Sequence, residues 1–382
     1  MVTWDSLKDK GIIVYGTGVN AAKCIYLLES SGIKIDYMLD GREGIGKFKD
    51  YPVYMPSDER MDGKYIIVAC ADETYKVIRE RLHKYKEFKD FIYYSWLDKK
   101  MVFLHGNCHM DIIETYLNSS VKFQREYAVY PTPRVCMDMH VDTAILRNMD
   151  IWIHEDIRTD NQFGYQFSDE YLRKFMTESV VEIVVPHLYG LGGGFFPFAN
   201  DWNNKNTALL NGGDRVGMFP RRDTLIEQCL DKKMSLEQIC SYVQGDGIFS
   251  SGDILQNFNT YLTKIQQREK DWDIKISDFI LTHYKAEKLF YDSGHPTNVI
   301  FEKISADILQ ILGISDWIST DLRLDSNEIP IYPWIRKVLG MEWTEERIRV
   351  SSNAKKCSDY MDIKEYIREY IWWCHPERDG GD

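Results

Sequence analysis

One segment of the chain places a cysteine where a nucleophile could act. The segment Gly106-Asn107-Cys108-His109 stands between the apolar run 101–105 and a stretch whose apolar residues have helical spacing. A thiol at such a strand-to-helix turn is presented outward, and a helix N-terminus favours its ionised form. Asn107 and the backbone N–H of Cys108 are candidate donors to an oxyanion, and the neighbouring His109 is a further catalytic candidate.

A second segment, far downstream, supplies an acid and an imidazole. Asp292 and His295 form a D-x-x-H pattern in a predicted loop ahead of a helix, where the acid can orient the imidazole toward a nucleophile on another element. Together with the Cys108 turn, this pattern resembles the layout of SGNH hydrolases, with cysteine in place of serine. The resemblance implies catalytic roles for Cys108, His295 and Asp292.

Each of these features also has an ordinary structural interpretation. A single cysteine after a strand is commonly a small buried hydrophobic residue, and a His-Pro pair at a helix start is commonly a cap. Their joint occurrence favours chemistry. We predict no metal site, because His105 and Cys108 flank a tight turn and the sequence has no second ligand cluster and no C-x-x-C.

A glycine-rich turn near the start of the chain favours nucleotide binding. Residues 16–21, Gly-Thr-Gly-Val-Asn-Ala, fit G-x-G-x-x-A between a predicted strand and a helix, and Asp40 ends the next predicted strand. Gly16 and Gly18 let the backbone approach a phosphate at the helix N-terminus, while the acid can bond ribose hydroxyls. The alternative is a scaffold of the same fold without a ligand.

Composition excludes several classes of protein. The formal net charge of −12 argues against a dedicated nucleic-acid binder, which needs basic surface. We expect no transmembrane segment and a cytoplasmic location, since the chain has no long apolar run and no signal-peptide pattern at its start. The eight cysteines are scattered without paired spacing, which indicates reduced thiols. Oligomeric state is open.

The order of patterns predicts an α/β fold in two domains. Strands and helices alternate over residues 1–98, which predicts a Rossmann-like parallel sheet. Residues 99–382 are predicted to form a larger α/β domain with a long loop at 188–220 and a helix-rich C-terminal part. Its predicted strands lie at 101–106, around 122–129, at 150–153 and at 180–186; its predicted helices lie at 222–231, 235–243, 251–270, from 295 to 312 and near 363–373.

The first domain also resembles the N-terminal unit of sugar acyltransferases of the PglD type. Asp40-Gly41 matches the acid that ends a strand in that family, and Tyr51-Pro52-Val53 matches its Pro-Val strand. The resemblance covers about the first 95 residues. It implies a nucleotide-sugar as readily as a nicotinamide cofactor.

The second domain resembles the WcbI family of capsular polysaccharide biosynthesis proteins, regarded as acetyltransferases that bind coenzyme A. The matching segments are LHGNCHMDIIETYL (104–117), DIWIHEDI (150–157), VVPHLYGLGGGFFPF (184–198), QREKDWDIKISDFI (267–280), KLFYDSGHPTN (288–298) and IPIYPWIRKVLGM (329–341). The resemblance implies acyl transfer from coenzyme A, with acetyl-CoA as substrate, to a sugar hydroxyl, with Cys108 and His295 in the active site. The chain departs from the family where glutamine is expected after Cys108 and near 154, since His109 and His154 stand there.

Two routes and two other functions stay open. His295 could activate the acceptor directly, or Cys108 could first take the acyl group. Arg221, Arg222 and Arg268, with Arg215, are candidate contacts for the phosphates of coenzyme A, or ordinary surface residues. The same catalytic residues would serve an esterase or deacetylase. A non-catalytic protein that binds a nucleotide-sugar or coenzyme A is the other alternative.

Overall fold

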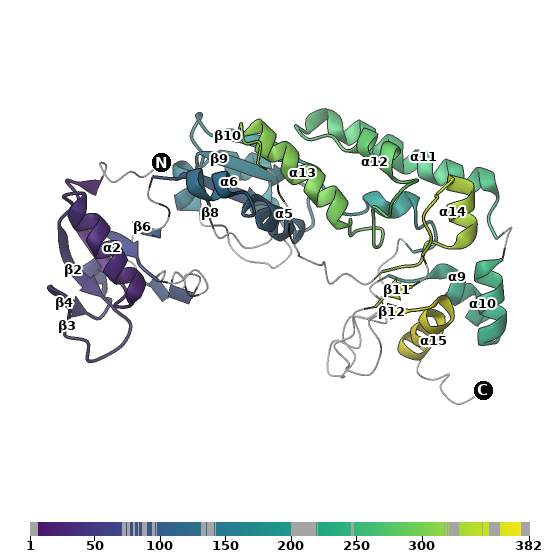
Figure 1. Ribbon diagram of the computed structural model, residues 1–382, viewed down its shortest axis with the longest axis horizontal. Helices are drawn as coiled ribbons and strands as arrows, with labels where there is room; N and C mark the ends of the chain where they lie inside the picture. The colour runs from purple at the N-terminus through teal and green to yellow at the C-terminus, as the bar shows by residue number, and fades with distance from the viewer. Residues whose placement is uncertain are drawn as a thin grey trace. The chain divides into compact units, whose positions relative to one another are not determined.

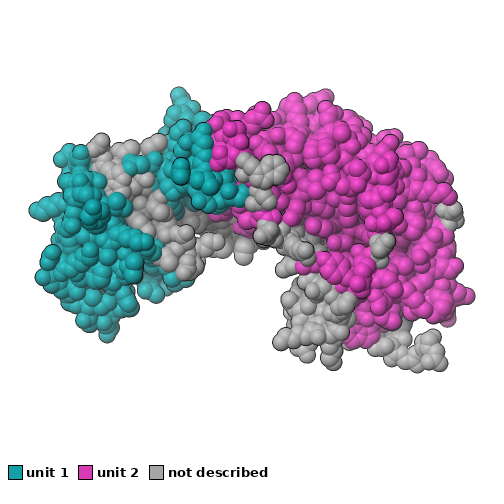
Figure 2. Space-filling model, in the orientation of Figure 1, with its two compact units in different colours: residues 1–110, 117–183 teal, residues 111–116, 184–382 magenta. Residues whose placement is uncertain are grey.

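The chain folds into two compact units in a computed structural model. The structure describes residues 7–375 apart from 71–73, 75–76, 79–80, 83, 86–89, 94–95, 97, 131–134, 136–140, 142, 200–218, 220, 246–247, 317, 319, 321–327, 346 and 351–359. One unit contains residues 1–110 and 117–183, and the other contains residues 111–116 and 184–382 (Figure 2).

The first sheet confirms the predicted parallel arrangement. Its described strands, in spatial order, are β3 (Lys47–Phe48), β4 (Tyr51–Tyr54), β2 (Ile35–Leu39), β1 (Ile12–Tyr15), β5 (Tyr65–Val68) and β6 (Asp90–Tyr93). All neighbouring pairs are parallel except β3 with β4. Helix α2 (Val19–Ser30) contacts β1 and β2 (Figure 1), and α3 (Asp58–Met61) follows β4.

The central strands β1 and β5 are buried on both faces of this sheet, and for this reason their sequences are continuous apolar runs. Along β1, Ile12 and Val14 pack into a core on one face, while Ile13 and Tyr15 pack into a core on the other. Strand β1 lies between β2 and β5, where the direction of chain progression reverses. The glycine turn that follows β1 therefore lies at the switch point where ligands of such sheets bind.

A second sheet positions the cysteine turn. Its described strands, in spatial order, are β10 (Val181–Val185), β9 (Ile151–Glu155), β7 (Lys100–His105) and β8 (Tyr127–Tyr130), and β7 is parallel to both β8 and β9. Strand β9 is buried throughout. Because His105 pairs with His154 in register, the residues that follow β7 lie beside the end of β9.

The rest of the chain is mainly helical, as predicted. The helices are α5 (His109–Leu117), α6 (Val121–Glu126), α7 (Asp169–Arg173), α9 (Thr224–Asp231), α10 (Leu236–Gln244), α11 (Ser251–Arg268), α12 (Ser277–His283), α13 (Asn298–Ile311), α14 (Pro333–Leu339) and α15 (Ile363–Cys374). Strand β11 (Ile348–Arg349) pairs antiparallel with β12 (Tyr360–Met361), and the 3-10 turn η5 (Leu191–Gly194) packs on α11. Within the described residues, no helix has both the length and the apolar character needed to cross a membrane.

Two local predictions were wrong. The strand expected around 122–129 is replaced over its first part by α6, because the Ser120 hydroxyl accepts a hydrogen bond from the N–H of Phe123 and caps a helix there. The helix expected from position 295 begins instead at Asn298, and Pro296 forms a bridge with Phe290. The segment before α13 is thus an ordered loop whose two ends pair through Phe290 and Pro296.

Candidate functional site

The Cys108 turn lies at the carboxyl end of β7, and the thiol residue is exposed. The Asn107 side-chain oxygen accepts a hydrogen bond of 2.8 Å from the N–H of His109 and so fixes the start of α5. The N–H of Asn107 donates to a Glu155 carboxylate oxygen at 3.3 Å. The oxyanion role expected of Asn107 and of the N–H of Cys108 stays a prediction.

Glu155 is a site residue that sequence reasoning missed. It ends β9, is only 1% exposed, and its Oε1 lies 3.6 Å from Nδ1 of His109, which is itself buried. The signal that could have revealed it is an acid two positions after the apolar run 151–153, because the ends of neighbouring parallel strands meet at one edge of a sheet. His109 faces this carboxylate inside the fold, and its catalytic role stays a prediction.

Two further buried histidines behave oppositely. Burial lowers the pKa of His105 to about 4, and its Nε2 lies 2.7 Å from the carbonyl oxygen of Phe167. Burial alone would also lower the pKa of His154, but hydrogen bonds to Asp169 and Glu182 outweigh it and raise the pKa to about 9. At neutral pH, His105 is therefore uncharged and His154 is an imidazolium ion.

The D-x-x-H segment forms the acid–imidazole pair that the sequence predicted. Asp292 is fully buried and accepts hydrogen bonds from the N–H of Gly294 at 2.5 Å and from the N–H of His295 at 2.9 Å. Its other oxygen lies 2.8 Å from Nδ1 of His295, whose side chain is 32% exposed. With Nδ1–H donated to the carboxylate, Nε2 carries the lone pair that a general base needs.

A buried arginine stands behind this pair. The Arg221 side chain is 2% exposed, and its Nε lies 4.0 Å from an Asp292 carboxylate oxygen. Its Nη1 donates to the Tyr189 hydroxyl at 3.0 Å. Burial alone would raise the pKa of Asp292, but the hydrogen bond from His295 and the charges of His295 and Arg221 outweigh burial and hold the pKa below its ordinary value. Tyr189 is a second residue that sequence reasoning missed.

The other candidate arginines differ from Arg221 in their exposure. Arg222 and Arg268 are exposed, so a phosphate could reach both directly, whereas Arg221 is enclosed by Asp292 and Tyr189. Arg215 lies outside the described residues. The assignment of these arginines to coenzyme A stays a prediction.

In the glycine turn that follows β1, the first position, residue 16, can only be glycine without strain. Gly16 has a φ of +116°, and a Cβ there would stand 2.7 Å from the carbonyl oxygen of Ala69. Gly18 precedes α2 as its N-cap. Asp40, 6% exposed, accepts hydrogen bonds from the Thr17 hydroxyl at 2.7 Å and from Nε of Arg42 at 3.0 Å. Burial opposes ionisation of Asp40, but these bonds outweigh it and lower its pKa.

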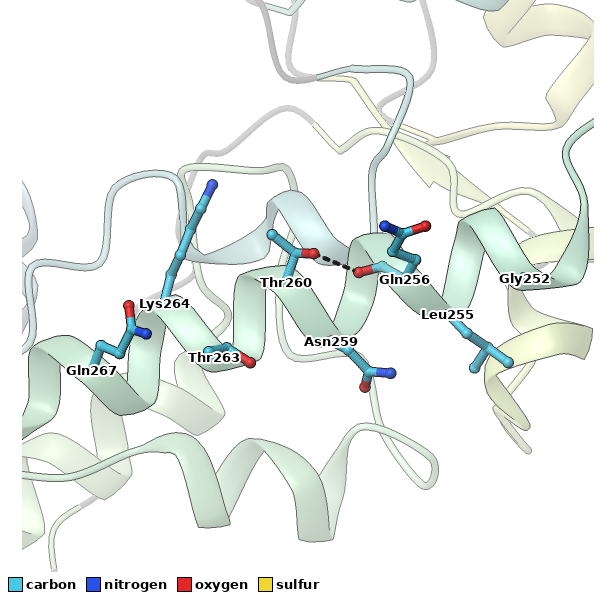
Figure 3. Close-up of a pocket in the computed structure, with 8 residues that line it drawn as sticks. All are labelled: Gly252, Leu255, Gln256, Asn259, Thr260, Thr263, Lys264 and Gln267. Atoms are coloured by element: carbon cyan, nitrogen blue, oxygen red, sulfur yellow. Dashed lines mark hydrogen bonds between the residues drawn. The ribbon is translucent and has the colours of Figure 1, made fainter.

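A shallow open depression of about 640 Å³ lies along α11 (Figure 3). Its lining is Gly252, Leu255, Gln256, Asn259, Thr260, Thr263, Lys264 and Gln267, all from this one helix. It contains none of the predicted catalytic residues. In the part of the chain that the structure describes, no three His, Cys, Asp or Glu side chains are grouped to hold a metal ion.

The fold and these sites define an α/β protein with a thiol turn in one unit and an acid–imidazole pair in the other. The family model of the polysaccharide biosynthesis enzyme WcbI matches residues 101–316, more than half of the chain. The chain belongs to the WcbI family of polysaccharide biosynthesis enzymes. No curated protein matches the chain.

Two solved structures show similarity. One is WcbI, described as a novel polysaccharide biosynthesis enzyme, in a native form without a disulfide bond between coenzyme A and one of its cysteines. It has a TM-score of 0.59 and 19% identity, over 73% of this chain and 90% of that chain. At this identity the likeness shows a shared fold. The other, a pseudomurein peptide ligase type C from Methanothermus fervidus, has a TM-score of 0.22 and 14% identity over 46% of this chain and 44% of that chain, too low to bear on the fold. The PglD-type and SGNH-like resemblances stay predictions.

Proposed function

We propose that this protein transfers an acyl group, acetyl in the simplest case, from a coenzyme A thioester to a sugar hydroxyl of a surface or capsular polysaccharide precursor. The observation that carries the proposal is the Asp292–His295 pair, in which a buried carboxylate orients an imidazole that is partly open to solvent. Membership of a family of polysaccharide biosynthesis enzymes supports a sugar as the acceptor. The solved WcbI structure, whose description names coenzyme A, supports the donor.

In the direct route, His295 removes the proton from the acceptor hydroxyl through Nε2. The oxygen attacks the thioester carbonyl, the C–S bond breaks, and the thiolate of coenzyme A takes the proton from His295. Asp292 holds Nδ1–H throughout and stabilises the imidazolium that forms in between. The products are an acylated sugar and coenzyme A with a free thiol.

In the alternative route, Cys108 carries the acyl group between donor and acceptor. Its thiolate attacks the thioester, coenzyme A leaves, and the acceptor hydroxyl then attacks the new thioester on Cys108. The exposure of Cys108 and the donors at its turn support this route. The named cysteine of the solved WcbI structure suggests that Cys108 is at least the thiol beside bound coenzyme A.

The test measures binding and turnover separately. Calorimetry with coenzyme A and acetyl-CoA is carried out on the wild type and on Cys108→Ala, and mass spectrometry checks Cys108 for an acyl adduct, with Cys70→Ala as the matched control. Thiol release from acetyl-CoA is then followed with a panel of methyl glycosides. We expect His295→Asn to bind acetyl-CoA normally and to lose turnover by about 100-fold or more. Absence of binding by the wild type would refute the proposal, and binding by the wild type without thiol release would leave only a binding role. Full turnover in His295→Asn would refute the role of His295.

The same pair favours one second candidate, an esterase or deacetylase. Nothing in the Asp292–His295 geometry requires coenzyme A, and water in place of the acceptor would make the reaction a hydrolysis. Hydrolysis of 4-nitrophenyl acetate without coenzyme A measures this activity. A hydrolysis rate that exceeds transfer from acetyl-CoA and disappears in His295→Asn would favour the esterase.

We also propose that the first sheet binds a nucleotide or nucleotide-sugar at its carboxyl edge. The support is the glycine turn at the switch point and the Asp40 carboxylate held by Thr17 and Arg42. Gly18 offers a sharp test, because a Cβ there meets no atom within 4 Å. Gly18→Ala should fold normally and weaken binding of UDP-glucose or NAD by about 10-fold through crowding of the phosphate. Equal affinity in both proteins would argue against this site.

A further inference from the structure

The buried guanidinium of Arg221 contacts the loop that carries the acid–imidazole pair. Gly294 lies between Asp292 and His295, and a Cβ at Gly294 would stand 2.4 Å from Nη2 of Arg221 and 3.2 Å from the Tyr189 ring. No side chain can therefore separate the guanidinium from this stretch of backbone. The guanidinium also lies 5.0 Å from the centroid of the Tyr189 ring.

The buried carboxylate of Asp292 needs a nearby cation to remain ionised. The carboxylate is fully buried, and an ionised group in such a place is costly unless a charge and hydrogen bonds compensate it. The general-base role requires a neutral His295 before the reaction, so the imidazole does not balance the carboxylate at that stage. Arg221, itself 2% exposed with Nε 4.0 Å from Asp292, supplies the opposite charge.

We propose that Arg221 is a positioning residue of the Asp292–His295 pair, with the Tyr189 hydroxyl as its second anchor. This inference rests on the proposed function and deepens it. Arg221 keeps Asp292 ionised and in place, so that the carboxylate holds Nδ1–H of His295 and Nε2 faces the acceptor. The role differs from a contact with a phosphate of coenzyme A, which would need an accessible guanidinium.

The charge of Arg221 also acts after His295 has taken a proton. The imidazolium then lies beside a carboxylate that Arg221 already neutralises, so it is held less tightly than it would be by Asp292 alone. It can therefore return the proton to the departing thiolate. A lysine at position 221 would keep this charge but lose the planar fork that reaches Asp292 and Tyr189 together.

The experiment compares Arg221→Met, Arg221→Lys and Tyr189→Phe with the wild type, and uses Arg368→Met as the matched control. Arg368 belongs to the same unit, and its side chain is 55% exposed. The first measurement is proton NMR of the His295 Nδ1–H, which a hydrogen bond to a buried carboxylate moves to low field; its loss in His295→Asn assigns it. The second is kcat and KM for acetyl-CoA from thiol release, with far-UV circular dichroism to confirm folding.

We expect Arg221→Met to lose the low-field signal and to lower kcat by about 100-fold, with KM for acetyl-CoA little changed. Arg221→Lys should recover about a tenth of the wild-type kcat, and Tyr189→Phe should lose less than about 10-fold. A raised KM for acetyl-CoA with unchanged kcat and an unchanged signal in Arg221→Met would overturn the inference in favour of a phosphate contact.

The two proposals fail in different ways. A wild type that binds acetyl-CoA without turnover refutes acyl transfer, yet the NMR signal still decides the positioning role. Persistence of that signal in Arg221→Met refutes the positioning role even if the wild type is an active transferase. If Arg221→Met does not fold, unchanged signals and rates in Arg221→Lys and Tyr189→Phe refute it instead.

Discussion

The buried imidazolium of His154 makes the stability of the first unit depend on pH. Its Nε2 lies 2.9 Å from Glu182, its Nδ1 lies 3.1 Å from Asp169, and the side chain is 2% exposed. The carboxylate partners overcome burial and raise its pKa from 6.5 to about 9, which corresponds to about 3 kcal/mol of stabilisation of the charged form. Because the folded value lies above the unfolded value, this stabilisation is complete below pH 6.5 and is lost as the pH rises through about 9.

The substitution His154→Gln removes this titration and keeps a polar side chain of similar reach. In the wild type, the free energy of unfolding should exceed that of the variant most at pH 6, and the difference should shrink by about 3 kcal/mol by pH 10. Urea denaturation at fixed pH values measures this difference. Unfolding is followed by far-UV circular dichroism and by intrinsic tryptophan fluorescence, to which Trp152 contributes; its ring centroid lies 3.8 Å from that of His154. A difference that stays constant from pH 6 to pH 10 would refute the argument that His154 is an ion pair in the fold.

Three other substitutions test the positions of single groups through thermal or urea denaturation. Gly16→Ala should cost about 1–3 kcal/mol, because φ is +116° and the new Cβ meets a carbonyl oxygen at 2.7 Å; a loss below about 0.5 kcal/mol would contradict this. Lys288→Met should cost about 3–5 kcal/mol, since it leaves the buried carboxylate of Glu345 with the more distant cation Arg336, 4.0 Å away, and an unchanged midpoint would contradict it. Tyr332→Phe should cost about 1–3 kcal/mol, because it removes the 2.7 Å hydrogen bond to buried Asp223, and a neutral effect would show that the bond contributes nothing.

The parts of the fold that sequence could predict are those set by local patterns. The buried strands Ile12–Tyr15 and Ile151–Glu155 could be recognised because the first is an apolar run and the second begins with one at 151–153. The Asp292–His295 contact was equally accessible, because the two residues lie three positions apart in one loop. Strand 122–129 was mistaken because a single capping residue, Ser120, decided between helix and strand.

The parts that sequence could not predict depend on neighbours distant in the chain. Glu155 reaches the Asn107 turn only because β9 pairs with β7, and Arg221 reaches Asp292 across 71 positions of sequence. The side chain of an arginine after a long loop looks the same in the sequence whether it is exposed, like Arg222, or buried, like Arg221. For these arginines, burial of the charge is a property of the assembled unit and has no local signal.

The Cys108 turn and the Asp292–His295 pair differ in what the surrounding hydrogen bonds hold in place. At the thiol turn, the Asn107 oxygen and the Glu155 carboxylate accept hydrogen bonds that hold the start of α5, so much of the polar structure there serves the fold. Around Asp292, every hydrogen bond and the Arg221 charge converge on one carboxylate that orients one imidazole. A base held in this way needs no covalent intermediate to work. If the proposed acyl transfer is correct, the orientation of His295 by Asp292 supports the direct route, and an acyl adduct on Cys108 that forms and decays at the rate of turnover would support the covalent route instead.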